Sequence, residues 1–141
     1  MSPTLLRILI AGVFFVHGVG HIMGLLPITG AASSETWTAE SWLLSGILGD
    51  TITRAIGFIL FFVAFLGFIG AALALMGWLV PHELWRTLAI WSAVISLIAI
   101  ILFWNAFVAL FPNKIGAIAV DVATLVALLW ANWPSEADIG Y

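Results

Sequence analysis

The sequence predicts an all-α integral membrane protein, an up-down bundle of four helices with a longer first loop. Composition is the first reason: of 141 residues, 64% are hydrophobic and 8% are charged, and the mean hydropathy is +1.22. A soluble domain has about a quarter of its residues charged, because its surface faces water. The second reason is that long uncharged runs separate the few charges. We therefore expect a single membrane domain, residues 1–141, in a multi-pass protein of a prokaryotic cytoplasmic membrane.

The uncharged runs define the expected membrane spans. Positions 8–34, 55–82 and 87–113 carry no formal charge. Each run exceeds the roughly 20 apolar residues that cross a hydrocarbon core of about 30 Å. Helices are expected because a backbone in lipid must satisfy its own hydrogen bonds, and the runs lack the alternation of barrel strands. The expected spans are residues 5–26, 52–80, 87–110 and 115–131.

The connections between the spans predict how the helices pack. The second and third connections, residues 81–86 and 111–114, are short, so successive helices are expected to lie antiparallel. The first connection is longer, and its segment 33–44 has a serine/threonine start signal followed by a mixed apolar and polar run. That segment could form a short helix on the membrane surface or a solvated linker. Tryptophans near the expected span ends suit the interface: Trp78, Trp85, Trp130 and Trp133.

Charge and cysteine content exclude several classes of function. The formal net charge of −3, without a cluster of cations, argues against a nucleic-acid partner. The absence of cysteine excludes disulfides, thiolate nucleophiles and cysteine-ligated clusters. No nucleophile–base pair, phosphate loop or cofactor fingerprint is present, so a binding or accessory role is favoured over an enzyme. With Arg7 and Arg86 expected on one side and Arg54 and Lys114 on the other, the positive-inside rule leaves the orientation open.

Polar residues at membrane depth are the candidate functional residues, because such groups cost a few kcal/mol each and tend to mark sites. At 1.5 Å per residue, His21, Asn105 and Asp121 are expected in one layer, roughly 8–9 Å below the surface on the side of the long loop. Arg54, near the start of the second span, could lean down as a cation for Asp121. His17 lies one turn deeper than His21 on the same helix face.

Three interpretations of this layer stay open. A His–Asp pair in a dry pocket can bind a polar ligand head, pass a proton, or hold an imidazole for a quinone oxygen. The same side chains can instead be interhelical glue, at about 0.6–2 kcal/mol per contact. A divalent metal is the third interpretation, since His17 and His21 share a helix face at i, i+4 and Asp121 could be a third ligand.

Glycines surround the two histidines of the first span. Gly20 and Gly24 form a small-xxx-small motif, with Gly18 beside them. Such a motif lets helix backbones approach closely, either within a bundle or between the subunits of a homo-oligomer. We therefore expect this face to be a packing surface.

Two segments carry a family resemblance. Phe14-Phe15-Val16-His17-Gly18 lies in the first span and is followed by the longer loop, and Gly70-Ala71-Ala72-Leu73-Ala74-Leu75-Met76-Gly77 closes the second span. In these features and in its topology the chain resembles the small DoxX/DoxD-like membrane proteins. Many of those proteins carry a glutamate ahead of the glycine-rich end, where this chain has Phe65-Leu66-Gly67-Phe68. The resemblance implies a bundle that works beside an oxidoreductase or a quinone, and it supplies no catalytic residue.

The sequence thus predicts an accessory or ligand-binding membrane subunit with a quinone or another lipid-like ligand. A small transporter or proton-pathway protein is the main alternative, and a purely structural bundle is the other. The expected partners are the lipid bilayer, a second copy of the chain, or a membrane redox protein.

Overall fold

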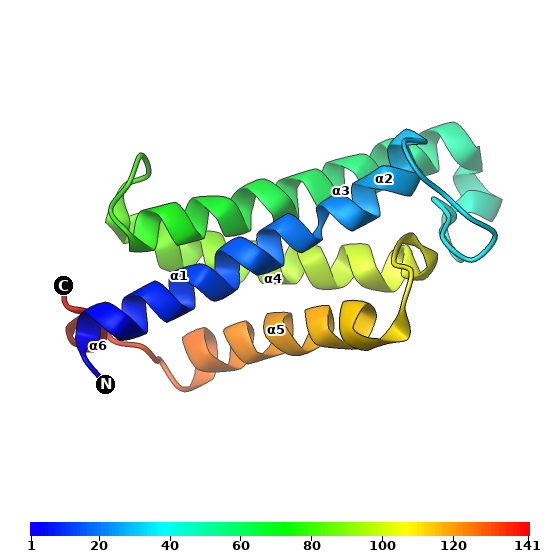
Figure 1. Ribbon diagram of the computed structural model, residues 1–141. Helices are drawn as coiled ribbons and strands as arrows, with labels where there is room; N and C mark the ends of the chain where they lie inside the picture. The colour runs from blue at the N-terminus through cyan, green and yellow to red at the C-terminus, as the bar shows by residue number, and fades with distance from the viewer.

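Helices make up the structure, a computed structural model that describes residues 1–141. Four stretches are long and apolar enough to cross a membrane: Pro3–Thr29, Ser45–Leu75, His82–Leu102 and Leu110–Trp130. Successive long helices run in opposite directions, so the arrangement is up-and-down (Figure 1). The α-helices are Pro3–Gly20 (α1), Ile22–Thr29 (α2), Ser45–Leu75 (α3), Trp85–Leu102 (α4), Ile115–Leu125 (α5) and Glu136–Ile139 (α6). Shorter helical turns are His82–Leu84 (η1), Trp104–Ala106 (η2), Leu110–Lys114 (η3) and Val126–Trp130 (η4).

The first long stretch is broken at His21, between α1 and α2. The backbone N–H of His21 donates to the carbonyl of Gly18, three residues back, at 3.0 Å. The imidazole Nδ1 of His21 donates to the carbonyl of His17 at 2.9 Å. A side chain that inserts into the backbone ladder in this way is a known cause of a helix break. The same hydrogen bond to the carbonyl of His17 fixes the orientation of the His21 ring.

The second and third long helices differ in extent from the sequence prediction of 52–80 and 87–110. α3 begins seven residues before position 52, at Ser45, with a kink at Gly49, and it ends at Leu75. A turn with positive φ at Gly77 and Leu79 follows it. α4 ends at Leu102, before a non-helical residue that starts the turn η2. These ends are set by backbone dihedrals, which hydropathy does not report.

Of the two alternatives left open for residues 33–44, the short helix is not formed and the segment is an irregular linker. An isolated bridge joins Ser34 to Trp37, and helical structure starts only with α3. The indole N–H of Trp37 donates to the carbonyl of Ala106 at 2.9 Å, and that of Trp42 donates to the carbonyl of Ile101 at 2.7 Å. Because carbonyls at a helix C-terminus lack partners within the helix, these indoles satisfy groups left free at the ends of the turn η2 and of α4.

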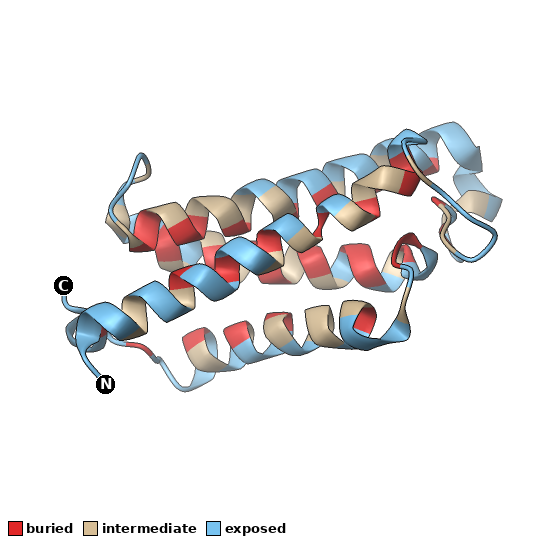
Figure 2. Ribbon diagram, in the orientation of Figure 1, coloured by how far each residue is buried: buried red, intermediate tan, exposed pale blue.

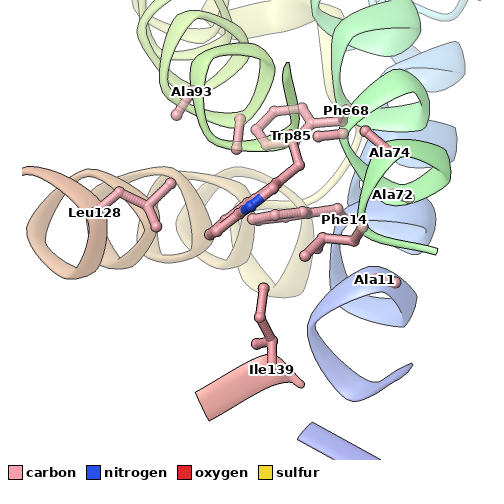
Figure 3. Close-up of a cluster of buried hydrophobic side chains, with 12 residues drawn as sticks. Ala11, Phe14, Phe68, Ala72, Ala74, Trp85, Ala93, Leu128 and Ile139 are labelled. Atoms are coloured by element: carbon pink, nitrogen blue, oxygen red, sulfur yellow. The ribbon is translucent and has the colours of Figure 1, made fainter. Parts of the chain in front are cut away.

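Two apolar clusters fill the bundle, one toward each end. In the first cluster, the buried rings of Phe14, Phe68 and Trp85 come together from α1, α3 and α4 (Figure 3). The second cluster lies toward the long loop and includes Phe61, Phe103 and Phe107. Alanines between these rings let α3 and α4 approach closely: Ala71, Ala74, Ala89 and Ala93.

The buried residues face inward from every long helix, and the outward faces are exposed (Figure 2). Those outward faces are apolar. Val16 is 70% exposed, Ile59 is 59% exposed and Trp91 is 62% exposed. A soluble protein rarely exposes so much contiguous apolar surface. Charge is concentrated at the two ends of the bundle and in the loops.

The C-terminal tail docks on the end of the bundle opposite the long loop. His82 contacts Glu136 of α6 through Nε2 at 2.8 Å, and its ring stacks on that of Tyr141 with centroids 3.4 Å apart. The hydrogen bond from His82 holds the pKa of the Glu136 carboxyl below its ordinary value. Arg7 of α1 lies over the Tyr141 ring at 4.8 Å, so the tail also touches the first helix.

Candidate functional site

A hydrogen-bonded network of four side chains lies between α1, α4 and α5. Nε2 of His17 is 2.8 Å from Oδ1 of Asp121. The other carboxyl oxygen of Asp121, Oδ2, lies 2.5 Å from the hydroxyl oxygen of Ser96. Ser96 Oγ is in turn 2.8 Å from Nε2 of His21. Asp121 and Ser96 are each 0% exposed and His21 is 1% exposed, so the network is enclosed by protein.

The available hydrogens restrict the protonation states of this network. Nδ1 of His21 must carry a hydrogen, because its partner is the carbonyl of His17, which only accepts. Ser96 has a single hydroxyl hydrogen. If Ser96 donates to Asp121, then His21 is doubly protonated and donates to Ser96 through Nε2. If Ser96 donates to His21 instead, then Asp121 carries the proton and donates to Ser96.

Both arrangements contain the same number of protons, so they interconvert by moving protons along the Ser96 hydroxyl. The first arrangement separates charge into an imidazolium and a carboxylate, and the second is uncharged. Burial of separated charge costs several kcal/mol per ion before their attraction is counted. The uncharged arrangement, with the proton on Asp121, is therefore favoured while the network stays dry. His17 keeps its hydrogen on Nε2 in either case.

A groove runs along the outside of this network, between α1 and α5. These two helices make few close approaches, since α5 packs chiefly against α4. The groove encloses about 780 Å³. His17 and His21 form part of its wall, and Gly20 leaves space there because no other group lies within 4 Å of its would-be Cβ. Apolar side chains form most of the remaining wall: Ile8, Leu9, Val13, Val16, Phe107 and Val120.

A second, entirely apolar cavity of about 260 Å³ continues the groove toward the C-terminal tail. Leu9, Val13 and Val120 line both spaces, so the two adjoin along the α1–α5 seam, and together they are called the trough. The trough thus has a polar end at the histidines and an apolar end near Trp133 and Pro134. This division matches the shape of an amphiphilic molecule with a polar head and an apolar tail.

Two residues of the expected polar layer lie elsewhere. Arg54 does not reach Asp121: its guanidinium donates to the carbonyls of Pro27 and Ile28, both at 3.2 Å. It therefore holds the end of α2 against α3. Asn105 is exposed in η2, because α4 ends before it, and its carbonyl accepts from the backbone of Thr38 at 2.9 Å.

The partners within the network also differ from the expected pairing of His21 with Asp121. His17, one turn deeper, makes the direct contact, and His21 is linked through Ser96. Ser96 was missed because a serine in an apolar helix often bonds to its own backbone, as Ser92 does with Leu88 at 2.6 Å. One signal was available in the sequence. Ser92 and Ser96 lie one turn apart in the third expected span, the span that also holds Asn105.

A metal site does not emerge from these side chains. The structure contains no group of three or more His, Cys, Asp or Glu residues arranged to hold an ion. His17, His21 and Asp121, the three ligands expected for a divalent metal, are arranged as a chain of hydrogen bonds. Both ring nitrogens of His21 have protein partners.

The glycines expected at a packing surface divide into two groups. A Cβ on Gly24 would lie 2.8 Å from the Phe61 ring, and one on Gly18 would lie 3.1 Å from Phe68. These two glycines therefore permit close contact between the first long stretch and α3. Gly20 faces the groove instead.

Comparison with known proteins adds no further assignment. No protein-family model matches the chain, and neither a curated protein nor a solved structure does. The resemblance to DoxX/DoxD-like proteins thus stays a prediction from the segments around His17 and Gly70.

Proposed function

We propose that the protein is a multi-pass membrane protein that binds an amphiphilic small molecule, a quinone or another lipid-like compound, in the α1–α5 trough. The observation that carries the proposal is the position of His17 and His21 at one end of an otherwise apolar trough. Four helices long and apolar enough to cross a membrane support the location. The polar head would lie beside His17 and the tail between α1 and α5.

The headgroup would determine which molecule binds. A tail that leaves lipid for an apolar trough gains little hydrophobic free energy, because lipid chains are as apolar as the wall. A hydrogen bond inside the membrane contributes about 0.6–2 kcal/mol. Selectivity is therefore expected from the imidazole of His17 and from Asn113, whose amide lines the same groove and donates to the sulfur of Met23 at 3.4 Å.

The family resemblance extends this proposal to a role beside a membrane oxidoreductase, as an accessory subunit of a prokaryotic cytoplasmic membrane. The exposed apolar faces leave room for a second copy or a redox partner. A transporter or proton-pathway role uses the same trough and network, and solute- or pH-driven flux into proteoliposomes tests it.

Ligand-induced thermal stabilisation in detergent tests the proposed binding. We expect a short-chain quinone or its quinol to raise the melting temperature, because a ligand at 100 times its Kd stabilises a protein by about 2.7 kcal/mol. Val13→Trp fills the trough at the point that both cavities share and should abolish the rise. Val63→Trp places the same side chain on an exposed position of α3 away from the trough and should leave it intact.

An equal rise in Val13→Trp and Val63→Trp would contradict the trough as the binding site. A panel of quinones, quinols and phospholipids that produces no rise in the wild-type protein would contradict ligand binding altogether. The polar network would then be left with the role of interhelical glue.

A further inference from the structure

We infer that His17 acts as the proton acceptor for a ligand hydroxyl, so that the trough takes a hydroxyl-bearing amphiphile of the phenol or quinol class. The inference rests on the proposed function, since it needs a ligand in the trough. It assigns the chemistry of the headgroup and the atom that receives it. The reaction is a reversible proton transfer without oxidation.

The two ring nitrogens of His17 have different surroundings. Nε2 is committed to Asp121 at 2.8 Å. No protein group hydrogen-bonds to Nδ1, and His17 lines the groove. In both arrangements of the network Nε2 of His17 carries the hydrogen, so Nδ1 presents a lone pair. An acceptor of this kind selects a ligand that donates, such as a hydroxyl, over a ligand that only accepts.

Contact with the Asp121 carboxylate would increase the basicity of His17. When the proton of Asp121 moves through Ser96 to His21, Asp121 becomes a carboxylate in direct contact with His17. A carboxylate on one ring nitrogen fixes the tautomer and stabilises the imidazolium that forms when the other nitrogen takes a proton. The relay therefore couples the protonation of His21 to the basicity of His17.

The relay places one charge of each sign beside His17, and the negative one is the nearer. The titratable groups in contact with it are Asp121 from α5 and His21, whose ring lies edge-on with centroids 4.9 Å apart. α3 presents only the Phe68 ring, 4.6 Å away between centroids. Ser96 of α4 reaches His17 only through Asp121.

The proposed step transfers a proton from the ligand hydroxyl to Nδ1 of His17. The O–H bond of the ligand breaks, its electron pair stays on the ligand oxygen, and an N–H bond forms at Nδ1 of His17. The products are a ligand oxyanion and an imidazolium in contact, which attract each other strongly where water is scarce. The amide of Asn113 lines the groove from the η3 side, where it contacts Met23.

An alkyl-chain nitrophenol tests the inference, because its anion absorbs at a longer wavelength than the acid and its ionisation can be read directly. Bound to the wild-type protein in detergent, the probe should ionise about 1–3 pH units lower than in empty micelles, as expected beside an opposite charge. His17→Gln should retain the probe and lose this shift. His82→Gln is the matched histidine control and should keep it, because His82 lies at the end of the bundle that holds the tail.

Asp121→Asn gives a second variant that is expected to fold, since its amide can donate to Ser96 as the protonated acid does. It cannot form the carboxylate, so most of the shift should disappear. If the bound probe ionises at the same pH in the wild type and in His17→Gln, the role of His17 is overturned. The trough as the binding site is not contradicted by that result, because both proteins retain the probe. Equilibrium dialysis that shows no retention by the wild type would contradict the trough and this inference together.

The wild-type protein alone provides an independent test. Nitrogen NMR of histidine-labelled protein distinguishes the two neutral tautomers. The inference requires His17 to carry its hydrogen on Nε2 without ligand and on both nitrogens with the probe bound. A hydrogen on Nδ1 in the ligand-free protein would overturn it.

Discussion

Nε2 of His17 lies 2.8 Å from Oδ1 of Asp121, although the two residues are 104 positions apart. This contact crosses a seam along which α1 and α5 otherwise make few close approaches. It is therefore both a link that holds α5 to the first helix and a polar group beside an open trough.

Removing the carboxyl group should destabilise the bundle more than replacing it by an amide. Asp121→Ala leaves His17 and Ser96 without their buried partner, and a buried unsatisfied polar group costs about 1–3 kcal/mol. Asp121→Asn keeps an acceptor for His17 and a donor for Ser96, so we expect a loss under about 1 kcal/mol. Thermal or denaturant unfolding in detergent measures the difference. Equal losses in the two variants would show that hydrogen bonding by Asp121 is not what stabilises the seam.

Ser96→Ala should lower stability because it leaves Nε2 of the buried His21 without a partner. The expected loss is about 1–3 kcal/mol. Ser92→Ala is the matched control, one turn away on α4, where the hydroxyl bonds only to the carbonyl of Leu88 in its own helix. Unfolding of the two variants should differ clearly, and a loss as large in Ser92→Ala would contradict the assigned role of Ser96.

Acid should loosen the C-terminal tail. Because His82 lowers the pKa of Glu136, the ionised carboxyl stabilises the docked tail above its ordinary pKa of 4.5, and this contribution is lost as pH falls through the lowered value. Glu136 is 53% exposed, so we expect less than about 1 kcal/mol. Tyr141 is the single tyrosine, so its ring NMR signal reports docking without assignment.

Glu136→Gln should remove this pH dependence, since the amide does not titrate. We expect the Tyr141 signal of that variant to lack the transition that the wild type shows below pH 4.5. The same change in both proteins would mean that another group controls the tail.

Gly24→Ala should disrupt packing between α2 and α3. The added Cβ would lie 2.8 Å from the Phe61 ring, which is fully buried, and overpacking of this kind costs about 1–3 kcal/mol. Gly12→Ala is the control, because no other group lies within 4 Å of its would-be Cβ. In α1 that substitution should be neutral or stabilising by up to about 1 kcal/mol, since alanine is the better helix former.

The number and approximate places of the long helices could be predicted from the sequence, because crossing a membrane imposes a minimum apolar length that charge spacing reveals. Their ends could not. α4 ends at Leu102, and α3 is followed by positive φ at Leu79, features decided by local dihedrals and tertiary contacts. The predicted depth of Asn105 was wrong for this reason, because it was counted along a helix that ends at Leu102, before Asn105.

Part of the candidate site could be predicted because ionisable residues at membrane depth are rare and conspicuous. His17, His21 and Asp121 were found in this way. Ser96 could not be, since a serine carries no charge and is common in apolar helices. Arg54 reaches the carbonyls of Pro27 and Ile28 at the end of α2 instead of Asp121.

The trough lies along the flank of the bundle, in the seam between α1 and α5. The proposed guest would thus arrive sideways from the surrounding hydrocarbon without passing through water. Its supply would depend on how strongly it partitions into the membrane, so a sparingly water-soluble compound would be enriched there before it meets His17. Weak intrinsic affinity would then be sufficient for occupancy.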